Sequence, residues 1–194
     1  MATLTSLCVY CGSSERVAER HKEAAADLGR AAAQRGVRIV FGGGRVGLMG
    51  VLAEAALQAG GKVTGIIPEQ LRAREVGHDG IGDLRVVGTM HARKQLMCED
   101  SDAFCALPGG LGTLDETFEI VTWKQLGIHD KPVVLVNVAG YWDPLLALVE
   151  HQAEAGYVRP AHRELFQVVQ TVDQIFETVA AAPEPRIKGL SWMG

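Results

Sequence analysis

The stretch from Pro108 to Glu116 reads Pro-Gly-Gly-Leu-Gly-Thr-Leu-Asp-Glu, and its place in the chain decides the fold. It directly follows the apolar run Ala103–Leu107, and a helical pattern runs through Thr113–Leu126. A strand, a glycine loop and a helix start are therefore predicted in succession. The first N–H groups of a helix lack a carbonyl partner, and glycines let the backbone approach a ligand closely. An anion is the ligand that such a turn binds best.

The same unit recurs on either side of this stretch. Upstream, the predicted strand Ser6–Cys11 leads through Gly12-Ser13-Ser14 into a helix over Glu15–Arg35, and the strand Val37–Phe41 leads through glycines into a helix over Val46–Ala59. Further strands are predicted at 62–67, 84–87, 132–138 and 165–169, further helices at 90–101, 141–155 and 172–181, and a polar loop, a candidate lid, at 69–82. Strands without alternating polarity are buried on both faces. We therefore predict an α/β fold: a doubly wound, mostly parallel, Rossmann-like sheet with helices on both faces.

Length and composition are those of one ordinary globular domain. The chain has 194 residues, 47% of them hydrophobic and 22% charged. We expect a single domain over residues 1–182 and a loose tail over 183–194. The net charge of −4, without a basic stripe, argues against a nucleic-acid partner. An apolar stretch of about 18 residues and a signal-peptide pattern are both missing, so a cytoplasmic protein without membrane contact is expected.

Four cysteines lie in apolar surroundings and are expected to be buried thiols. Cys8 and Cys11 form a C-x-x-C pair, but the second pair that a zinc site needs is missing. No metal site is predicted.

A dinucleotide site is the first alternative to consider for the loop Gly42–Gly47, which satisfies G-x-G-x-x-G between a strand and a helix. The acid that would hold the ribose is missing from the end of the next strand, where Glu69 comes only after Pro68. The nucleotide-triphosphate grip G-x-x-x-x-G-K-[ST] is missing too. Three glycine-rich loops at strand ends nevertheless favour one shared cleft over three separate tight turns.

Two charged positions have a structural alternative. Thr113 and Glu116 have the spacing of a T-x-x-E capping box, in which Glu116 would only close the helix start. Arg93 and Lys94 have the alternative of being solvated charges on an exposed helix face.

The residues Met90–Lys94, Pro108–Glu116 and Gly42–Gly50 closely resemble the corresponding motifs of the LONELY GUY (LOG) family. The similarity runs from about Leu4 to about Ala180 and includes Trp123–Pro132. Members of that family are cytokinin riboside 5′-monophosphate phosphoribohydrolases. The resemblance implies hydrolysis of the N-glycosidic bond of an N6-substituted AMP, or of AMP itself, to free base and ribose 5-phosphate. It implies no metal or organic cofactor, and a homodimer.

The resemblance also implies roles for individual residues. Arg93 and Glu116 match the catalytic pair of the family. The positions that match substrate-binding residues are Glu75, Lys94, Gly109, Gly110, Leu111, Gly112, Thr113, Leu114, Asp115 and Thr122, with weaker matches at Ser13, Ser14, Gly43 and Met90. Leu111 stands where the family often has an aromatic residue and Asp115 where it often has Glu, which leaves the substrate preference open.

The chemistry asks for such groups. When the bond from C1′ to the base breaks, positive charge develops on the ribose and negative charge on the purine. Glu116 would stabilise the ribose cation and orient the attacking water. The loop N–H groups and Thr113 would hold the phosphate, and Arg93 would neutralise charge on either the phosphate or the base.

Two other functions have to be weighed. A nucleotide or molybdenum-cofactor carrier resembles this fold and shares the second glycine loop, but needs no working carboxylate. A lysine decarboxylase, a label sometimes attached to this glycine motif, would need pyridoxal phosphate on a lysine such as Lys94. The pair of Arg93 and Glu116 favours the hydrolase.

Overall fold

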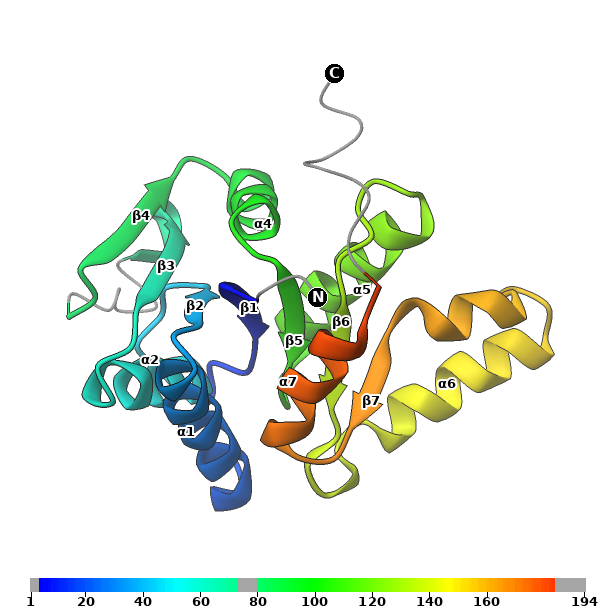
Figure 1. The fold of residues 1–194 in the computed structure, drawn as a ribbon. Helices are drawn as coiled ribbons and strands as arrows, with labels where there is room; N and C mark the ends of the chain where they lie inside the picture. Colours follow the sequence, from blue (N-terminus) through cyan, green and yellow to red (C-terminus); the bar gives the residue numbers. More distant parts are fainter. Residues whose placement is uncertain (1–3, 73–79, 184–194) are drawn as a thin grey trace.

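A seven-stranded parallel sheet runs through the computed structural model, which describes residues 4–72 and 80–183 (Figure 1). The strands are β1 (Ser6–Tyr10), β2 (Arg38–Phe41), β3 (Val63–Pro68), β4 (Asp83–Val87), β5 (Ala103–Ala106), β6 (Val133–Val136) and β7 (Gln167–Val169). Their order across the sheet is β4-β3-β2-β1-β5-β6-β7, and every bonded pair is parallel. The chain reverses direction across the sheet between β1 and β5. The predicted doubly wound α/β fold is confirmed, and such a reversal is where these folds bind ligands.

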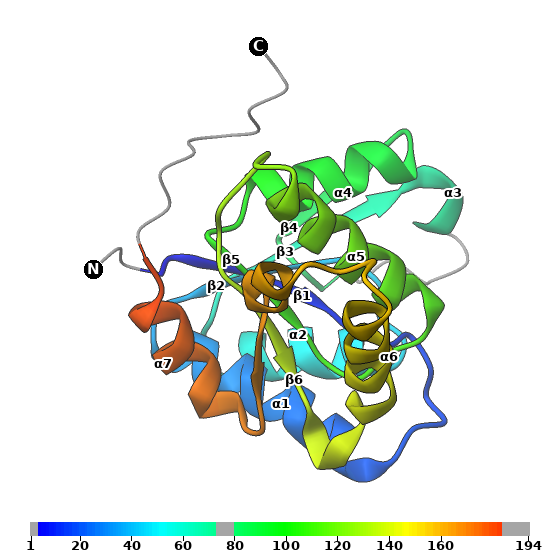
Figure 2. The same cartoon turned by 90° about the vertical axis from the view of Figure 1, so that its right-hand side faces the viewer.

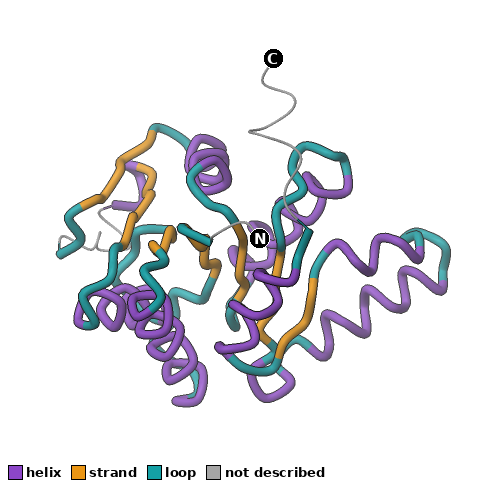
Figure 3. The backbone as a smooth tube through the Cα atoms, viewed as in Figure 1, coloured by secondary structure: helices purple, strands orange, loops and turns teal. Residues whose placement is uncertain are grey.

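Helices cover both faces of this sheet. They are α1 (Glu19–Gln34), α2 (Leu48–Gln58), α3 (Glu69–Arg72), α4 (Met90–Glu99), α5 (Leu111–Gln125), α6 (Asp143–Glu154) and α7 (Val172–Ala181), with short 3₁₀ turns η1 (Val138–Gly140) and η2 (Pro160–Leu165). Strands and helices alternate along the chain (Figure 3). Turned by 90°, the molecule shows α4 and α5 on one side of the sheet and α1 and α2 on the other (Figure 2).

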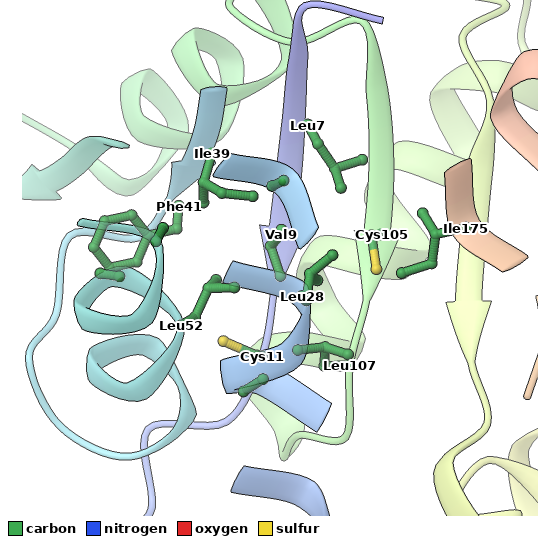
Figure 4. Packing of buried hydrophobic residues seen from close by; sticks show 14 of the residues in the cluster. Leu7, Val9, Cys11, Leu28, Ile39, Phe41, Leu52, Cys105, Leu107 and Ile175 are labelled. Atoms are coloured by element: carbon green, nitrogen blue, oxygen red, sulfur yellow. The ribbon is translucent and has the colours of Figure 1, made fainter. Parts of the chain in front are cut away.

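The larger part of the core lies under α1, α2 and α7. Leu28 of α1, Leu52 of α2 and Ile175 of α7 belong to one buried cluster with Val9 of β1 and Cys105 of β5 (Figure 4). Every residue of β1 and β5 is buried, as expected for strands covered on both faces.

The opposite face has a core of its own. Met97 and Ile120, from α4 and α5, pack with Tyr10 and Phe104, whose rings stack at a centroid distance of 6.3 Å. These contacts fix α4 and α5 side by side above the end of β5. The two helices carry the candidate catalytic residues.

Several predicted boundaries differ from the structure. The first helix begins at Glu19, not Glu15, because the backbone of Ser13 and Ser14 packs against the loop after β2. The predicted loop 69–82 begins with the short helix α3. Residues 73–79 of this loop, among them the predicted site residue Glu75, lie outside the described residues. The same holds for residues 184–194 of the expected tail. The last strand begins at Gln167 and not at Leu165, because Leu165 ends η2 and Phe166 is the C-cap of that turn.

Within the described residues, we find no helix long and apolar enough to cross a membrane.

Candidate active site

Three glycine loops meet at the carboxyl edge of the sheet. The loop after β1 is bonded to the loop after β5, because the Gly12 N–H donates to the carbonyl of Pro108 at 3.1 Å. It is bonded to the loop after β2 as well, because the Leu48 N–H donates to the carbonyl of Gly12 at 2.9 Å. The three loops therefore lie together at this edge, as predicted, and residues of all three line one cavity.

Close stacking of these loops requires glycine at position 47. Gly47 has a φ of 69°, which only glycine adopts without strain. A Cβ there would also lie 2.5 Å from the carbonyl carbon of Ser13. Gly47, the last glycine of the motif Gly42–Gly47, thus allows the loop after β2 to pack against the loop after β1.

Helix α5 begins two residues earlier than predicted. Its N-cap is Gly110, and its first helical hydrogen bond runs from the Leu114 N–H to the carbonyl of Gly110 at 3.0 Å. Thr113 therefore stands inside the first turn and not at the N-cap, so the capping-box alternative for Glu116 is wrong. The N–H groups of Gly110 to Thr113 are left without a carbonyl of their own helix. The partial positive charge of the helix start is concentrated there.

Arg93 and Glu116 form a buried ion pair between α4 and α5. The Arg93 Nη2 lies 3.3 Å from the Glu116 Oε1, and the side chains are only 7% and 10% exposed. The alternative that Arg93 is a solvated surface charge is therefore wrong. Burying two charges is costly unless the pair has good partners, so a pair that faces a cavity points to a ligand.

Gly42 makes room for this arginine. A Cβ on Gly42 would lie 1.9 Å from the Arg93 Nη2, so the guanidinium rests directly on the backbone after β2. The Arg93 Nε is buried and has no hydrogen-bond partner among the residues that the structure describes. One donor of this side chain is thus available to a bound molecule.

The ion pair faces a cavity of about 260 Å³. Nine of the predicted site residues line it: Ser13, Met90, Arg93, Gly110, Leu111, Gly112, Thr113, Asp115 and Glu116. They come from the loop after β1 and from the starts of α4 and α5. The start of α5 thus turns its free N–H groups toward the same space as the buried carboxylate.

Six further predicted residues are described but do not line this cavity: Ser14, Gly43, Lys94, Gly109, Leu114 and Thr122. Ser14 is exposed and accepts a hydrogen bond from the Arg16 N–H, and Leu114 packs toward Trp142. Gly43, with a φ of 74°, sits against β3. Thr122 is exposed and lies about two and a half helical turns beyond Thr113.

Lys94 bridges α4 and α5, the two helices that carry Arg93 and Glu116. Its Nζ lies 3.2 Å from the Asp115 Oδ2 and 3.0 Å from the Glu119 Oε1. Burial disfavours the charged amine, but the hydrogen bonds to Glu119 and Asp115 outweigh it and raise the pKa of Lys94. The lysine is therefore held as a cation beside the site.

Six further residues line the cavity and were not predicted from the sequence: Val9, Cys11, Gly12, Gly42, Met49 and Leu71. Gly12 and Gly42 are the first residues of two of the quoted glycine runs, so the motifs could have predicted both as lining residues. Met49 and Leu71 are apolar residues of α2 and α3, and their direction depends on how these helices pack. Burial, together with the nearby Glu116 carboxylate, raises the pKa of the Cys11 thiol well above its usual value.

All four cysteines are free and buried, as predicted. Among the described residues, no group of three His, Cys, Asp or Glu side chains is placed to hold a metal ion.

Comparison with known proteins identifies the family of the chain. A family model described as "Possible lysine decarboxylase" matches residues 49–179. The cytokinin riboside 5′-monophosphate phosphoribohydrolase of Rhodococcoides fascians is 47% identical over 172 residues, which cover 88% of this chain and 87% of that protein. The cytokinin riboside 5′-monophosphate phosphoribohydrolase LOG3 of Arabidopsis thaliana is 45% identical over 169 residues, 87% of this chain and 79% of that one.

Solved structures share the fold at lower sequence identity. The molybdenum cofactor carrier protein of Chlamydomonas reinhardtii superposes with a TM-score of 0.69 at 23% identity, over 92% of this chain and 99% of that one. The molybdenum cofactor binding protein of Rippkaea orientalis gives 0.69 at 24% identity, over 92% and 96%. At this identity the likeness concerns the fold alone. Since the curated relatives match over most of both chains, the chain belongs to the LOG family of cytokinin riboside 5′-monophosphate phosphoribohydrolases.

Proposed function

We propose that this protein hydrolyses the N-glycosidic bond of an N6-substituted AMP or of AMP, releasing the free base and ribose 5-phosphate. The observation that carries the proposal is the buried Arg93–Glu116 pair, 3.3 Å apart, which lines the same cavity as the start of α5. A carboxylate and an anion-binding helix start are the two features that the reaction needs on one substrate. The names of the relatives support the same reaction.

The free N–H groups at the start of α5 and the Thr113 hydroxyl are assigned to the 5′-phosphate. Holding the phosphate there fixes the ribose, so that C1′ stays aligned with the attacking water. Glu116 is assigned to C1′, where its negative charge stabilises the cationic ribose and its oxygen accepts a proton from the water. These are the catalytic assignments for the chain's own residues.

Arg93 is assigned a charge-neutralising role at the edge of the substrate. Its Nη2 is engaged by Glu116, whereas its Nε is a buried donor without a described partner. An acceptor on the ligand, either a phosphate oxygen or a ring nitrogen of the leaving base, would satisfy that donor. Contact with the base would offset the negative charge that develops there during bond cleavage.

Lys94 argues against a decarboxylase. A lysine that forms a Schiff base must lose its proton, which a lowered pKa favours. Burial alone would lower the pKa of Lys94, but the contacts with Glu119 and Asp115 outweigh burial and raise this pKa. A carrier protein would not need a buried carboxylate such as Glu116 beside the helix start that we assign to the phosphate.

A homodimer is also proposed, and Thr122 is the reason. Leu111, Asp115, Phe118 and Thr122 follow one stripe of α5, because residues seven and eleven apart return to within about 20° on a helix. Leu111 and Asp115 line the cavity, and Phe118 is 42% exposed. If a second copy packed its α5 antiparallel across Phe118, two-fold symmetry would bring Thr122 of that copy beside Asp115 of the first. This arrangement accounts for a substrate-lining match so far from the chain's own cavity.

We propose the cytoplasm as the location, since the four cysteines are free thiols, the state that a reducing compartment maintains.

The test is direct. Purified protein is incubated with AMP and with isopentenyladenosine 5′-monophosphate without added metal, and free base and ribose 5-phosphate are followed by chromatography. Release from either substrate is the expected result, and the ratio of the two rates identifies the preferred N6 group. Binding of AMP without release would overturn the hydrolase and support a carrier.

A further inference from the structure

The turn after β6 has an unusual backbone. Ala139 has φ 51° and ψ 38°, and among the described residues it is the one non-glycine with a positive φ. The side chain of Asn137 holds this turn, because its Oδ1 accepts a hydrogen bond from the Trp142 N–H at 2.7 Å and its Nδ2 donates to the Asp143 Oδ1 at 2.7 Å. A strained conformation that neighbouring groups fix so firmly points to a functional requirement.

Tyr141 follows this turn directly, and the turn fixes its position. The Tyr141 hydroxyl donates to the carbonyl of Gly109 at 2.7 Å. The ring is held edge-on against Trp142, at a centroid distance of 4.9 Å, and against His21 of α1, at 5.2 Å. The strained turn therefore connects α1 to the loop that begins α5.

The bonded carbonyl belongs to the same peptide unit as the N–H of Gly110. In a trans peptide these two groups point in opposite directions, and the described residues contain no cis bond. Gly110 lines the cavity, whereas Tyr141 is not among its lining residues. With the carbonyl turned to Tyr141, the Gly110 N–H is turned away from it.

Packing restrains only one side of this peptide. A Cβ on Gly109 would lie 2.1 Å from the Thr113 Oγ1, so Gly109 is packed against the first turn of α5, whereas a Cβ on Gly110 would meet no atom within 4 Å. Neither residue has a side chain that restricts the dihedral angles beside the peptide. The hydrogen bond from Tyr141 adds a restraint on the direction of the Gly109 carbonyl.

We propose that Tyr141 is a positioning residue, which fixes the Gly109–Gly110 peptide so that the Gly110 N–H faces the phosphate of the substrate. This inference rests on the proposed function, in which the start of α5 holds that phosphate. Tyr141 itself does not contact the reacting atoms. Its effect is therefore confined to the phosphate end of the ligand.

The test is Tyr141→Phe, which removes the hydroxyl and keeps the ring contacts. Binding of ribose 5-phosphate and of adenine is measured by calorimetry, and base release from AMP by steady-state kinetics. We expect the Kd of ribose 5-phosphate and the KM of AMP to rise by about 2- to 12-fold, the factor for one neutral hydrogen bond. The Kd of adenine and the kcat should stay the same. Tyr157→Phe is the matched control, because Tyr157 is 87% exposed and outside the cavity lining.

Three outcomes would overturn the proposal: unchanged binding of ribose 5-phosphate, an equal loss for adenine, or a lower melting temperature as the only effect. The binding measurements do not depend on turnover. If the wild-type protein bound ribose 5-phosphate but released no base from AMP, the hydrolase would fail while the role of Tyr141 was still decided. Asn137→Ala, which frees the turn but keeps the hydroxyl, should show the same selective loss for ribose 5-phosphate.

Discussion

At the residue scale, the chemistry of the site depends on whether Glu116 acts as a charge or only as a structural partner of Arg93. Glu116→Gln distinguishes the two roles, because the amide keeps the shape and loses the charge. We expect base release to fall by about 10²- to 10⁴-fold, the usual contribution of a positioned carboxylate. AMP should still bind, since the helix start that we propose as its phosphate site is unchanged. Base release is followed by chromatography and binding by calorimetry.

Glu119→Gln is the matched control, because the same change is made on the same helix outside the cavity lining. It weakens one of the two ion pairs of Lys94 and should leave base release within about threefold of the wild type, as for a partly exposed ion pair. Normal turnover in Glu116→Gln would remove this carboxylate from the mechanism.

Gly42 carries a second prediction at this scale. In Gly42→Ala, the new Cβ would lie 1.9 Å from the Arg93 Nη2, so the guanidinium has to move away from Glu116. A displaced catalytic group typically costs about 100-fold, and we expect a loss in kcat/KM of that order. Gly82→Ala is the control, because a Cβ on Gly82 would meet no atom within 4 Å. Full activity in Gly42→Ala would show that Arg93 does not need its present position.

At the element scale, the sequence predicted the order of strands and helices and the starts of α4 and α7, but it misplaced the starts of α1, α2, α5 and α6 by two to four residues. The start of α5 was missed because Gly112 is a poor helix former, and the threonine with a glutamate three residues on imitates an N-cap. Only the packing of the three loops against one another fixes Gly110 as the cap. The glycine runs could be found from motifs, because these depend on local backbone needs, whereas Arg93 and Glu116 were singled out as a pair only by the resemblance to the LOG family.

The rest of the site could not be predicted, since it depends on contacts between distant elements. Met49 and Leu71 reach the cavity from α2 and α3, and nothing in their local sequence distinguishes them from core residues. Ser14 has the reverse problem: it belongs to a motif, but the turn of the chain leaves it exposed. Side-chain direction at such positions is a property of the packed molecule.

The turn between β6 and α6 gives a prediction about stability. Ala139 holds a left-handed conformation that costs an alanine about 1–2 kcal/mol, part of which glycine loses again as chain entropy in the unfolded state. Ala139→Gly should therefore raise the free energy of unfolding by about 0.5–1 kcal/mol, measured by urea denaturation. Ala147→Gly, an exposed position inside α6, should lower it by a similar amount. A loss of stability in both variants would mean that Ala139 is not strained.

At the scale of the whole molecule, His129 makes stability depend on pH. The side chain is 1% exposed, its Nδ1 accepts a hydrogen bond from the Lys131 N–H at 3.1 Å, and its Nε2 lies 2.8 Å from the Ile120 carbonyl. These contacts fit the neutral ring, and burial lowers the pKa of His129 to about 4. In the unfolded chain, the pKa of a histidine side chain is about 6.5. The unfolded state therefore binds a proton between pH 6.5 and 4 that the folded state does not.

The free energy of unfolding should fall as the pH is lowered through this window and level off, for this group, below about 4. The pKa of His129 differs by about 2.5 units between the unfolded and the folded chain, which corresponds to a change of roughly 3 kcal/mol in the free energy of unfolding across this window. Urea denaturation at pH 7.5, 5.5 and 4.5 measures it. His129→Gln should be less stable at pH 7.5 but lack this part of the slope, whereas His151→Gln, at an exposed position, should keep it. An unchanged slope in His129→Gln would assign the pH dependence to other groups.

The proposed assembly of two copies gives a last prediction, which concerns α5. Phe118 lies midway along the stripe that begins at Leu111 and Asp115, and an antiparallel α5 pair centred on it would repeat each contact by symmetry. Phe118→Glu would put two like charges at that centre. In light scattering we expect the wild type to be a dimer and Phe118→Glu to be a monomer at the same concentration. If Thr122 of the second copy completes the site, the monomer should also lose base release, and Thr122→Ala should reduce turnover while the dimer persists. The exposed change Leu148→Glu on α6 is the control and should affect neither property. A fully active Phe118→Glu monomer would show that each chain holds a complete site by itself.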